Sequence, residues 1–242
     1  MIRLATILAI ETATANCSVA LQYGDNVIQV SQQGNNIHSQ VLLDMVDKVL
    51  NQAGITVSDL DALAVGQGPG SFTGLRIGAG VAQGLAYGAK CPMLGVSSLA
   101  ALTIQAVKQK KISGKVLAAI DARMNEVYWA LYNIQSDNIA DELELVSEIQ
   151  VSEPSEIKID ALNIDLSNSD ISLLGNAWKA YPQEFDQDLM SKAMQLEDYI
   201  LPEAKGVLTV AQSMFARGEI IGPVDFTLEY VRNNVAVKSN KP

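Results

Sequence analysis

The sequence of 242 residues is poor in the side chains that most enzymes use to bind metals or to attack substrates. It has one histidine, His38, and two cysteines, Cys17 and Cys91. Metal and hydrolytic sites need several His, Cys or carboxylate groups that converge, so we expect no metal centre. The cysteines have no spacing typical of a disulfide framework, and we expect free thiols in a reducing compartment.

Positive charge is also scarce. The chain has 17 Lys and Arg against 27 Asp and Glu, which gives a net charge of −10. Phosphate contacts need clustered cations, so we do not expect the chain to bind nucleic acid by itself. No apolar run is long enough to span a membrane. The first apolar run is short and ends at Glu11, which favours a buried strand over a signal segment. We therefore expect a cytoplasmic location.

The pattern of hydrophobic residues predicts an α/β fold made of two similar halves, 1–110 and 111–242. Segments 8–21 and 118–131 align without gaps, and each contains a strand, an acid at its end (Glu11 or Asp121), a turn and a second strand. Strands are predicted at 3–10, 17–22, 27–33, 62–66, 92–96, 143–150 and 171–175, and helices at 36–52, 72–88, 98–110 and 203–217. The last helix could pack back on the first half, and residues 152–170 are polar and loop-rich.

Two interpretations of Glu11 and Asp121 stay open. Acids at strand ends, one from each half, hold metal-bound nucleotides in actin-like and sugar-kinase-like proteins, and Thr12 and Gly175 would then line the same cleft. Alternatively, each carboxylate accepts hydrogen bonds from its own turn. The glycines that a phosphate loop needs are missing after Asp121. A nucleotide site in this cleft would therefore be degraded and its binding weak, and the sequence predicts no definite cofactor.

Residues 66–88, "GQGPGSFTGLRIGAGVAQGLAYG", hold eight of the seventeen glycines. They fit neither common phosphate-loop pattern. Glycine inside a helix costs about 1 kcal/mol relative to alanine, so close packing along the helix explains most of them better, with Ser71 as the N-cap. The face expected on the sheet contains Gly74, Gly78, Val81, Ala82 and Leu85. The opposite side contains Arg76, Gln83 and Tyr87, flanked by Gly80 and Gly84.

Several segments together resemble the bacterial TsaB (YeaZ) family: "ILAIETATANCSVAL", "HSQVLLDMV", the glycine-rich segment, "GVSSLAAL", "DARMNEVYWALY" and "YVRNNVA". The resemblance covers nearly the whole chain. It implies the actin-like ATPase (ASKHA) fold, with two ribonuclease-H-like halves in tandem. It also implies an accessory subunit of the machinery that places threonylcarbamoyl on N6 of the adenosine beside the tRNA anticodon. Asp44 stands where the family often has proline.

The same resemblance assigns the chemistry to a partner. The catalytic paralogue TsaD binds a metal through H-x-x-x-H, and the matching positions here are Ser98 and Leu102. We therefore expect a non-catalytic subunit that dimerises with TsaD through helices 36–53 and 72–88, or with itself when TsaD is absent. It would work with the ATPase TsaE and reach tRNA only through the complex. The expected interface residues are His38, Leu42, Met45, Arg76, Gly80, Gln83, Gly84 and Tyr87.

Two enzyme classes remain as alternatives. The first is a small-molecule kinase or ATPase of the actin-like fold, which would use the acids Glu11 and Asp121. The second is a metallo-hydrolase, which the single histidine supports poorly. His38 begins a predicted helix, where a cap or contact residue is the simpler interpretation.

Overall fold

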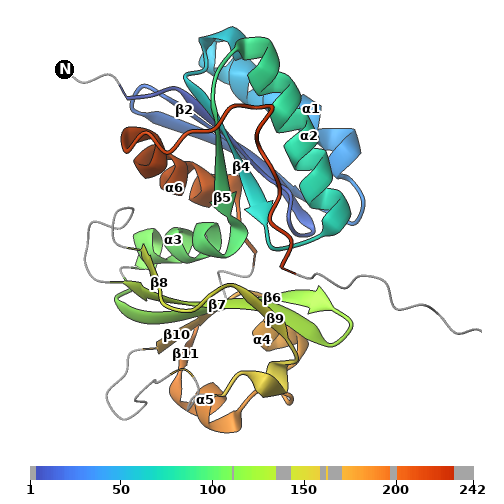
Figure 1. Cartoon of the computed structure of the whole chain (residues 1–242), viewed down its shortest axis with the longest axis vertical. Helices are drawn as coiled ribbons and strands as arrows, with labels where there is room; N and C mark the ends of the chain where they lie inside the picture. The colour runs from blue at the N-terminus through green and yellow to red at the C-terminus, as the bar shows by residue number, and fades with distance from the viewer. Residues whose placement is uncertain are drawn as a thin grey trace, which may run out of the picture.

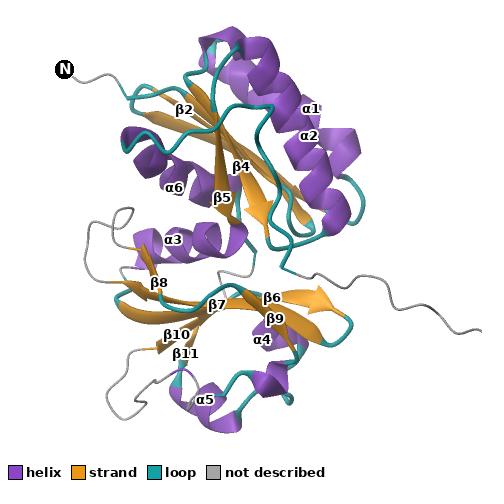
Figure 2. Cartoon of the chain, viewed as in Figure 1, coloured by secondary structure: helices purple, strands orange, loops and turns teal. Residues whose placement is uncertain are grey.

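The computed structural model describes residues 4–110, 112–134, 143–158, 162, 171–196 and 201–231. Two β-sheets form the frame (Figures 1 and 2). The first sheet has the order β3-β2-β1-β4-β5 and consists of β1 (Ile7–Glu11), β2 (Asn16–Tyr23), β3 (Asn26–Gln33), β4 (Ala62–Gly68) and β5 (Met93–Ser97). The second has the order β11-β10-β6-β7-β8 and consists of β6 (Gly114–Arg123), β7 (Glu126–Ile134), β8 (Leu143–Leu145), β10 (Ile171–Leu174) and β11 (Met194–Gln195), with β9 (Gln150–Ser152) also paired to β7.

The two sheets repeat one plan. In the first, β1 pairs antiparallel with β2 and parallel with β4. In the second, β6 pairs antiparallel with β7 and parallel with β10. The segments that align in the sequence, 8–21 and 118–131, therefore lie on equivalent strand pairs, so the internal repeat predicted a real structural repeat.

The helices form layers around these sheets (Figure 2). Helices α1 (His38–Ala53) and α2 (Phe72–Ala89) lie side by side on one face of the first sheet, and α6 (Ala204–Ala216) covers its other face. Helix α3 (Ser98–Lys110) packs on the second sheet and against α6, while α4 (Ala177–Ala180) and α5 (Gln187–Lys192) cover the outer face. None of the described helices is long and apolar enough to cross a membrane.

Helix α6 comes late in the chain but packs on the first sheet (Figure 1). Its apolar residues Ala204, Val207 and Leu208 are buried there. Gly206 has no side chain where α6 approaches α3, and a Cβ atom at this position would collide with the carbonyl of Ala101. The contact between α3 and α6 thus joins the two layers of the molecule.

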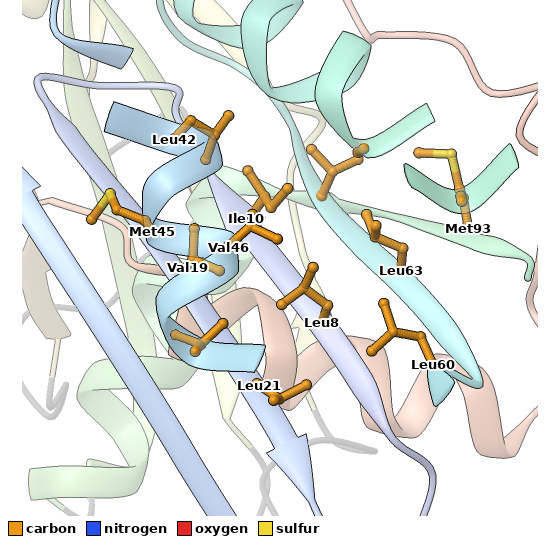
Figure 3. Close-up of a cluster of buried hydrophobic side chains, with 14 of the residues drawn as sticks. Leu8, Ile10, Val19, Leu21, Leu42, Met45, Val46, Leu60, Leu63 and Met93 are labelled. Carbon is orange, nitrogen blue, oxygen red and sulfur yellow. The ribbon is translucent and has the colours of Figure 1, made fainter. Parts of the chain in front are cut away.

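Helix α1 has the apolar spacing that the sequence predicted. Leu42, Met45 and Val46 contact the strands of the first sheet, as Figure 3 shows. The helix ends at Gly54, whose φ of 69° is the left-handed conformation that glycine adopts readily. This part of the fold follows directly from the hydrophobic pattern.

The second half differs more from the prediction. The single strand predicted at 143–150 is wrong, because β8 and β9 pair with different parts of β7, at Tyr132–Ile134 and at Val127–Trp129. Between them, the amides of Val146 and Ser147 both donate to the carbonyl of Leu131. Helices α4 and α5 and strand β11 were not predicted, since elements this short give no periodic signal. Most of 152–170 lies outside the described residues, as does the start of the strand predicted at 3–10.

Candidate functional site

The acids Glu11 and Asp121 lie at equivalent places, at the end of β1 and two residues before the end of β6, and they make equivalent hydrogen bonds. Glu11 Oε1 accepts from the amide of Ala13 at 2.7 Å. Asp121 Oδ1 accepts from the amide of Arg123 at 2.7 Å. Each carboxylate thus accepts from the amide two residues further on, which lies in the turn after β1 for Glu11 and at the last residue of β6 for Asp121. This geometry favours the turn-capping interpretation of both acids.

Glu11 is also enclosed. Its side chain is 0% exposed, and Ser98 Oγ donates to Oε2 at 2.9 Å. Gly66 lies so close that a Cβ atom there would collide with the carboxylate. Burial raises the pKa of Glu11 above its ordinary value of 4.5, although the hydrogen bonds from Ala13 and Ser98 act in the opposite direction. A carboxylate in this position binds its own turn and Ser98, and its side chain has no contact with solvent.

We expect Glu11→Gln to stabilise the protein above neutral pH. Because the pKa of Glu11 is raised in the folded state, its contribution to stability is present below pH 4.5 and is lost as the pH rises through the folded-state pKa. Glutamine keeps an oxygen for Ala13 and removes the buried charge. The free energy of unfolding should rise by on the order of 1 kcal/mol, which corresponds to a rise of about 2–4 °C in Tm. Thermal unfolding between about pH 4 and pH 9 measures the effect.

The matched control is Glu219→Gln. The hydrogen bond from Arg217 lowers the pKa of the exposed Glu219, so this substitution should give no gain at high pH. If Glu11→Gln proved less stable than the parent at pH values where the carboxylate is charged, the burial argument for Glu11 would be wrong.

The other predicted cleft residues also serve the chain's own packing. Thr12 is buried, and its Oγ1 donates to the carbonyl of Gly74 at 2.9 Å. Asp121 is half-buried and accepts from the hydroxyl of Tyr181 at 2.8 Å. Gly175 has a φ of 102°, and a Cβ atom there would collide with the carbonyl of Ala119. Glycine is therefore required at position 175, because the backbone there lies against Ala119 of β6.

The positions that the resemblance equates with metal ligands are used differently here. Ser98 donates to Glu11, and Leu102 is 0% exposed in the core between α3 and the second sheet. Cys17 and Cys91 are free and buried, and burial raises the pKa of Cys17 to about 11. Within the described ranges, no group of three or more His, Cys, Asp or Glu residues is arranged to hold a metal ion.

Three of the predicted interface residues of α1 lie inside the molecule. Leu42 and Met45 are 1% and 7% exposed, because their helical spacing marks the buried face of α1 (Figure 3). His38 is 6% exposed, and its Nε2 has no hydrogen-bond partner among the described residues. Ile37 occupies the N-cap position, so His38 is not the cap. Among the large hydrophobic side chains of α1, Leu43 is the exposed one, and it was not among the predicted interface residues.

The glycines of α2 fall into two groups. On the inner side, Gly74 and Gly78 press on the turn between β1 and β2, where Cβ atoms would collide with the carbonyl and the Oγ1 of Thr12. Ser71 caps the helix as predicted, accepting from the amide of Gly74. The buried side is Gly74, Leu75, Gly78, Ala79, Ala82 and Ala86.

The sheet-facing side predicted for α2 is therefore partly wrong. Val81 and Leu85, which we placed on it, are only half-buried. The helix docks through its backbone at the inner glycines, whereas the sequence pattern gave most weight to the large side chains. Ile77, Val81 and Leu85 instead fill the margin of the core that α1 also covers.

On the outer side of α2, Gly80, Gly84 and Gly88 recur every fourth residue. Among the residues that the structure describes, no atom lies within 4 Å of a Cβ atom added at any of the three. We call these residues the glycine ridge. Arg76 is exposed beside it, and Tyr87 is 70% exposed. The structure therefore brings Arg76, Gly80, Gly84 and Tyr87 to one exposed side of α2.

A segment near the C-terminus that was not predicted as part of the site borders this side of α2. Residues 222–230, which we call the C-terminal strap, run beside α2 (Figure 1). Gln83, predicted as an interface residue, is half-buried and donates to the carbonyls of Pro223 and Phe226. A groove of about 350 Å³ lies between the strap and α2, and is lined by Arg76, Ala79, Gly80, Gln83, Phe226, Thr227, Leu228 and Tyr230. The motif "YVRNNVA" marked only the end of this segment.

Comparisons with known proteins give a consistent result. Residues 30–239 match the family described as TsaD: tRNA N6-adenosine threonylcarbamoyltransferase. The tRNA threonylcarbamoyladenosine biosynthesis protein TsaB of Escherichia coli (strain K12) is 39% identical over 234 residues, which cover 96% of each chain. The TsaB protein of Haemophilus influenzae is 37% identical over 238 residues, again with 96% of each chain covered.

Solved structures agree with these sequence matches. A Pseudomonas aeruginosa structure described as similar to the peptidase YeaZ has a TM-score of 0.84 at 36% identity, covering 94% of this chain and 100% of that one. The YeaZ structure from the same organism has a TM-score of 0.82 at 36% identity, covering 93% of this chain and 99% of that one. The predicted α/β fold with two similar halves in tandem is confirmed, and it is the fold of these YeaZ structures. The chain belongs to the TsaB (YeaZ) family of tRNA threonylcarbamoyladenosine biosynthesis proteins.

Proposed function

We propose that this chain is a non-catalytic subunit that supports a TsaD-type enzyme. That enzyme would transfer threonylcarbamoyl from threonylcarbamoyl-AMP to N6 of the adenosine next to the tRNA anticodon. The chain would bind TsaD through the exposed side of α1 and α2, and would bind a second copy of itself through the same side when TsaD is absent. The ATPase TsaE would act on the assembled complex.

The observation that carries this proposal is the glycine ridge. Its three glycines have open space around them within the described part of the chain, so no described residue requires them to lack a side chain. Each lowers helix stability by about 1 kcal/mol relative to alanine. A surface without side chains lets the backbone of a partner helix approach closely, and Arg76 and Tyr87 beside it are residue types enriched at interfaces.

Two further observations support the absence of catalysis. The carboxylates of Glu11 and Asp121 bind their own turns, which weakens the alternative of a kinase of the same fold. Ser98 and Leu102, at the positions that match the metal ligands of TsaD, offer no imidazole. The reacting groups would then be supplied by the partner.

The test is a reconstituted transfer reaction. Labelled threonylcarbamoyl-AMP and tRNA are combined with this chain, with a TsaD protein from a TsaB-containing bacterium, or with both, and TsaE is added in a parallel series. We expect no transfer by this chain alone, little by TsaD alone and a clear stimulation by the pair. Transfer by this chain alone would contradict the proposal, and so would an unchanged TsaD rate with no complex in sedimentation.

A filter-binding arm separates tRNA binding from assembly. With a net charge of −10, the chain alone should bind tRNA with a Kd no tighter than about 1–100 μM near physiological salt. The pair with TsaD should bind more tightly because the cations would come from the partner. A sub-micromolar Kd for the isolated chain would mean that it has its own tRNA site.

A further inference from the structure

The C-terminal strap is fixed to the first sheet at both of its ends. Just before it, Met93 of β5 and Ile221 exchange two backbone hydrogen bonds of 2.8 and 3.0 Å. Near its end, the amide of Glu229 donates to the carbonyl of Gln67. The chain thereby crosses the edge of the sheet from the side of α6 to the side of α2 (Figure 1).

The middle of the strap is held by one buried ring and one amide group. Phe226 is 6% exposed and belongs to the core beneath α2. Gln83 Nε2 donates to the carbonyls of Pro223 at 2.9 Å and of Phe226 at 3.3 Å. These contacts make the strap a permanent part of the surface beside α2.

The end of the strap orders the side chain of Arg76. Arg76 Nε donates to the hydroxyl of Tyr230 at 3.1 Å. The guanidinium group lies 3.8 Å from the centre of the Phe72 ring, and the rings of Phe72 and Tyr230 lie 5.7 Å apart. An exposed arginine is thus held in one orientation by a hydrogen bond and by a cation–π contact.

The strap is a wall of the groove and does not cover the glycine ridge. Cβ atoms added at Gly80, Gly84 and Gly88 would meet no strap atom within 4 Å. A partner helix could therefore reach the ridge while the strap stays in place. This arrangement excludes the strap as an autoinhibitory cover of the ridge.

We propose that Tyr230 is a positioning residue for partner binding, which acts by holding Arg76 in the orientation that the partner contacts. The inference rests on the proposed function, because it assigns Arg76 to the TsaD interface. A long side chain that is ordered before binding loses less rotamer freedom on association. Tyr230 would thus increase the affinity for TsaD through Arg76, without contacting the partner itself.

The experiment is a double-mutant cycle on the affinity of the full chain for TsaD. Tyr230→Phe keeps the ring against Phe72 and removes the hydroxyl that binds Arg76. We expect a two- to twelve-fold increase in Kd, the usual range for ordering one such side chain. In an Arg76→Ala background, Tyr230→Phe should have no further effect, because the group through which it acts is missing.

Two controls accompany the cycle. Tyr23→Phe changes another exposed tyrosine, 42% exposed at the end of β2, and should leave the Kd unchanged. Hydrogen exchange of the strap amides should be the same in Tyr230→Phe and in the parent, since the contacts of Phe226 and Gln83 remain.

The outcomes are distinct. A parent-like or tighter Kd for Tyr230→Phe would overturn the inference, and so would losses that add in the double variant, because Tyr230 would then contact the partner directly. If the parent binds TsaD and either of these contradicting results is obtained, the role of Tyr230 is wrong but the proposed function stands. If the parent does not bind TsaD, the proposed function fails and this inference fails with it.

Discussion

Gly84→Leu is expected to fold like the parent and to lose its partner. A Cβ atom at Gly84 meets no described atom within 4 Å, so the part of the isolated chain that the structure describes leaves room for the new side chain. Leucine is a better helix former than glycine by about 0.7–1 kcal/mol, which should leave Tm equal to or slightly above that of the parent. In a complex, the same side chain would hold a partner helix away from the ridge.

The expected loss of affinity is at least about thirty-fold, the effect of removing a strong interface contact. It should apply to the complex with TsaD and to the homodimer, measured by sedimentation velocity and by titration. Gly84→Ala is the matched control, since it gives a similar gain in helix stability with only one methyl group. Its loss of affinity should be smaller.

One result would overturn this use of the ridge. If Gly84→Leu assembled like the parent but lost affinity for a nucleotide, the glycines would serve a ligand and the interface proposal would be wrong. Parent-like assembly with unchanged stability would show that the glycine ridge lies outside the interface.

Gly78→Leu should have the opposite effect and destabilise the folded chain. Gly78 lies on the inner side of α2, where a Cβ atom would collide with Thr12 Oγ1. Thr12 is fully buried and donates to the carbonyl of Gly74, so it has no free space into which to move. Overpacking of this kind costs about 1–3 kcal/mol and occasionally more. We expect a loss of about 3 kcal/mol or more in the free energy of unfolding, which corresponds to a fall in Tm of about 6–12 °C or more.

A double-mutant cycle tests this explanation. Gly78→Ala alone should already destabilise the chain, since the first added carbon makes the collision. Combined with Thr12→Ala, it should be close to neutral, because the remaining Cβ atom of residue 12 lies 3.4 Å from the added carbon, an ordinary contact. Equal effects of Gly78→Ala in both backgrounds, measured by denaturant unfolding, would show that Thr12 does not limit the packing.

The sequence by itself determined the frame of the molecule. Strand and helix periodicity located the elements of the first sheet and the buried face of α1, and the alignment of 8–21 with 118–131 identified the structural repeat. Ser71 as an N-cap and the extent of the helix predicted at 36–52 were also readable. These features depend on contacts between residues near in sequence, or on which side chains avoid water, so a local pattern is sufficient to predict them.

The helical pattern of the sequence already placed Gly78 on the inner side of α2 and Gly84 near the outer side, and the structure agrees. Only the tertiary structure gave the exact side by which α2 docks, because the pattern also placed the half-buried Val81 and Leu85 on the sheet. The backbone of α2 meets the turn at Thr12, which is distant in sequence, and this contact sets the orientation of the helix.

The same reason applies to the acids and to the strap. The sequence left open whether Glu11 holds a ligand or binds its own turn, and only the structure shows that Gly66 and Ser98 enclose it. Tyr230 reaches Arg76 across a sequence separation of 154 residues. Such contacts depend on how the layers pack. Each joins two segments that are distant in sequence, and the hydrophobic pattern of one segment does not reveal which other segment it contacts.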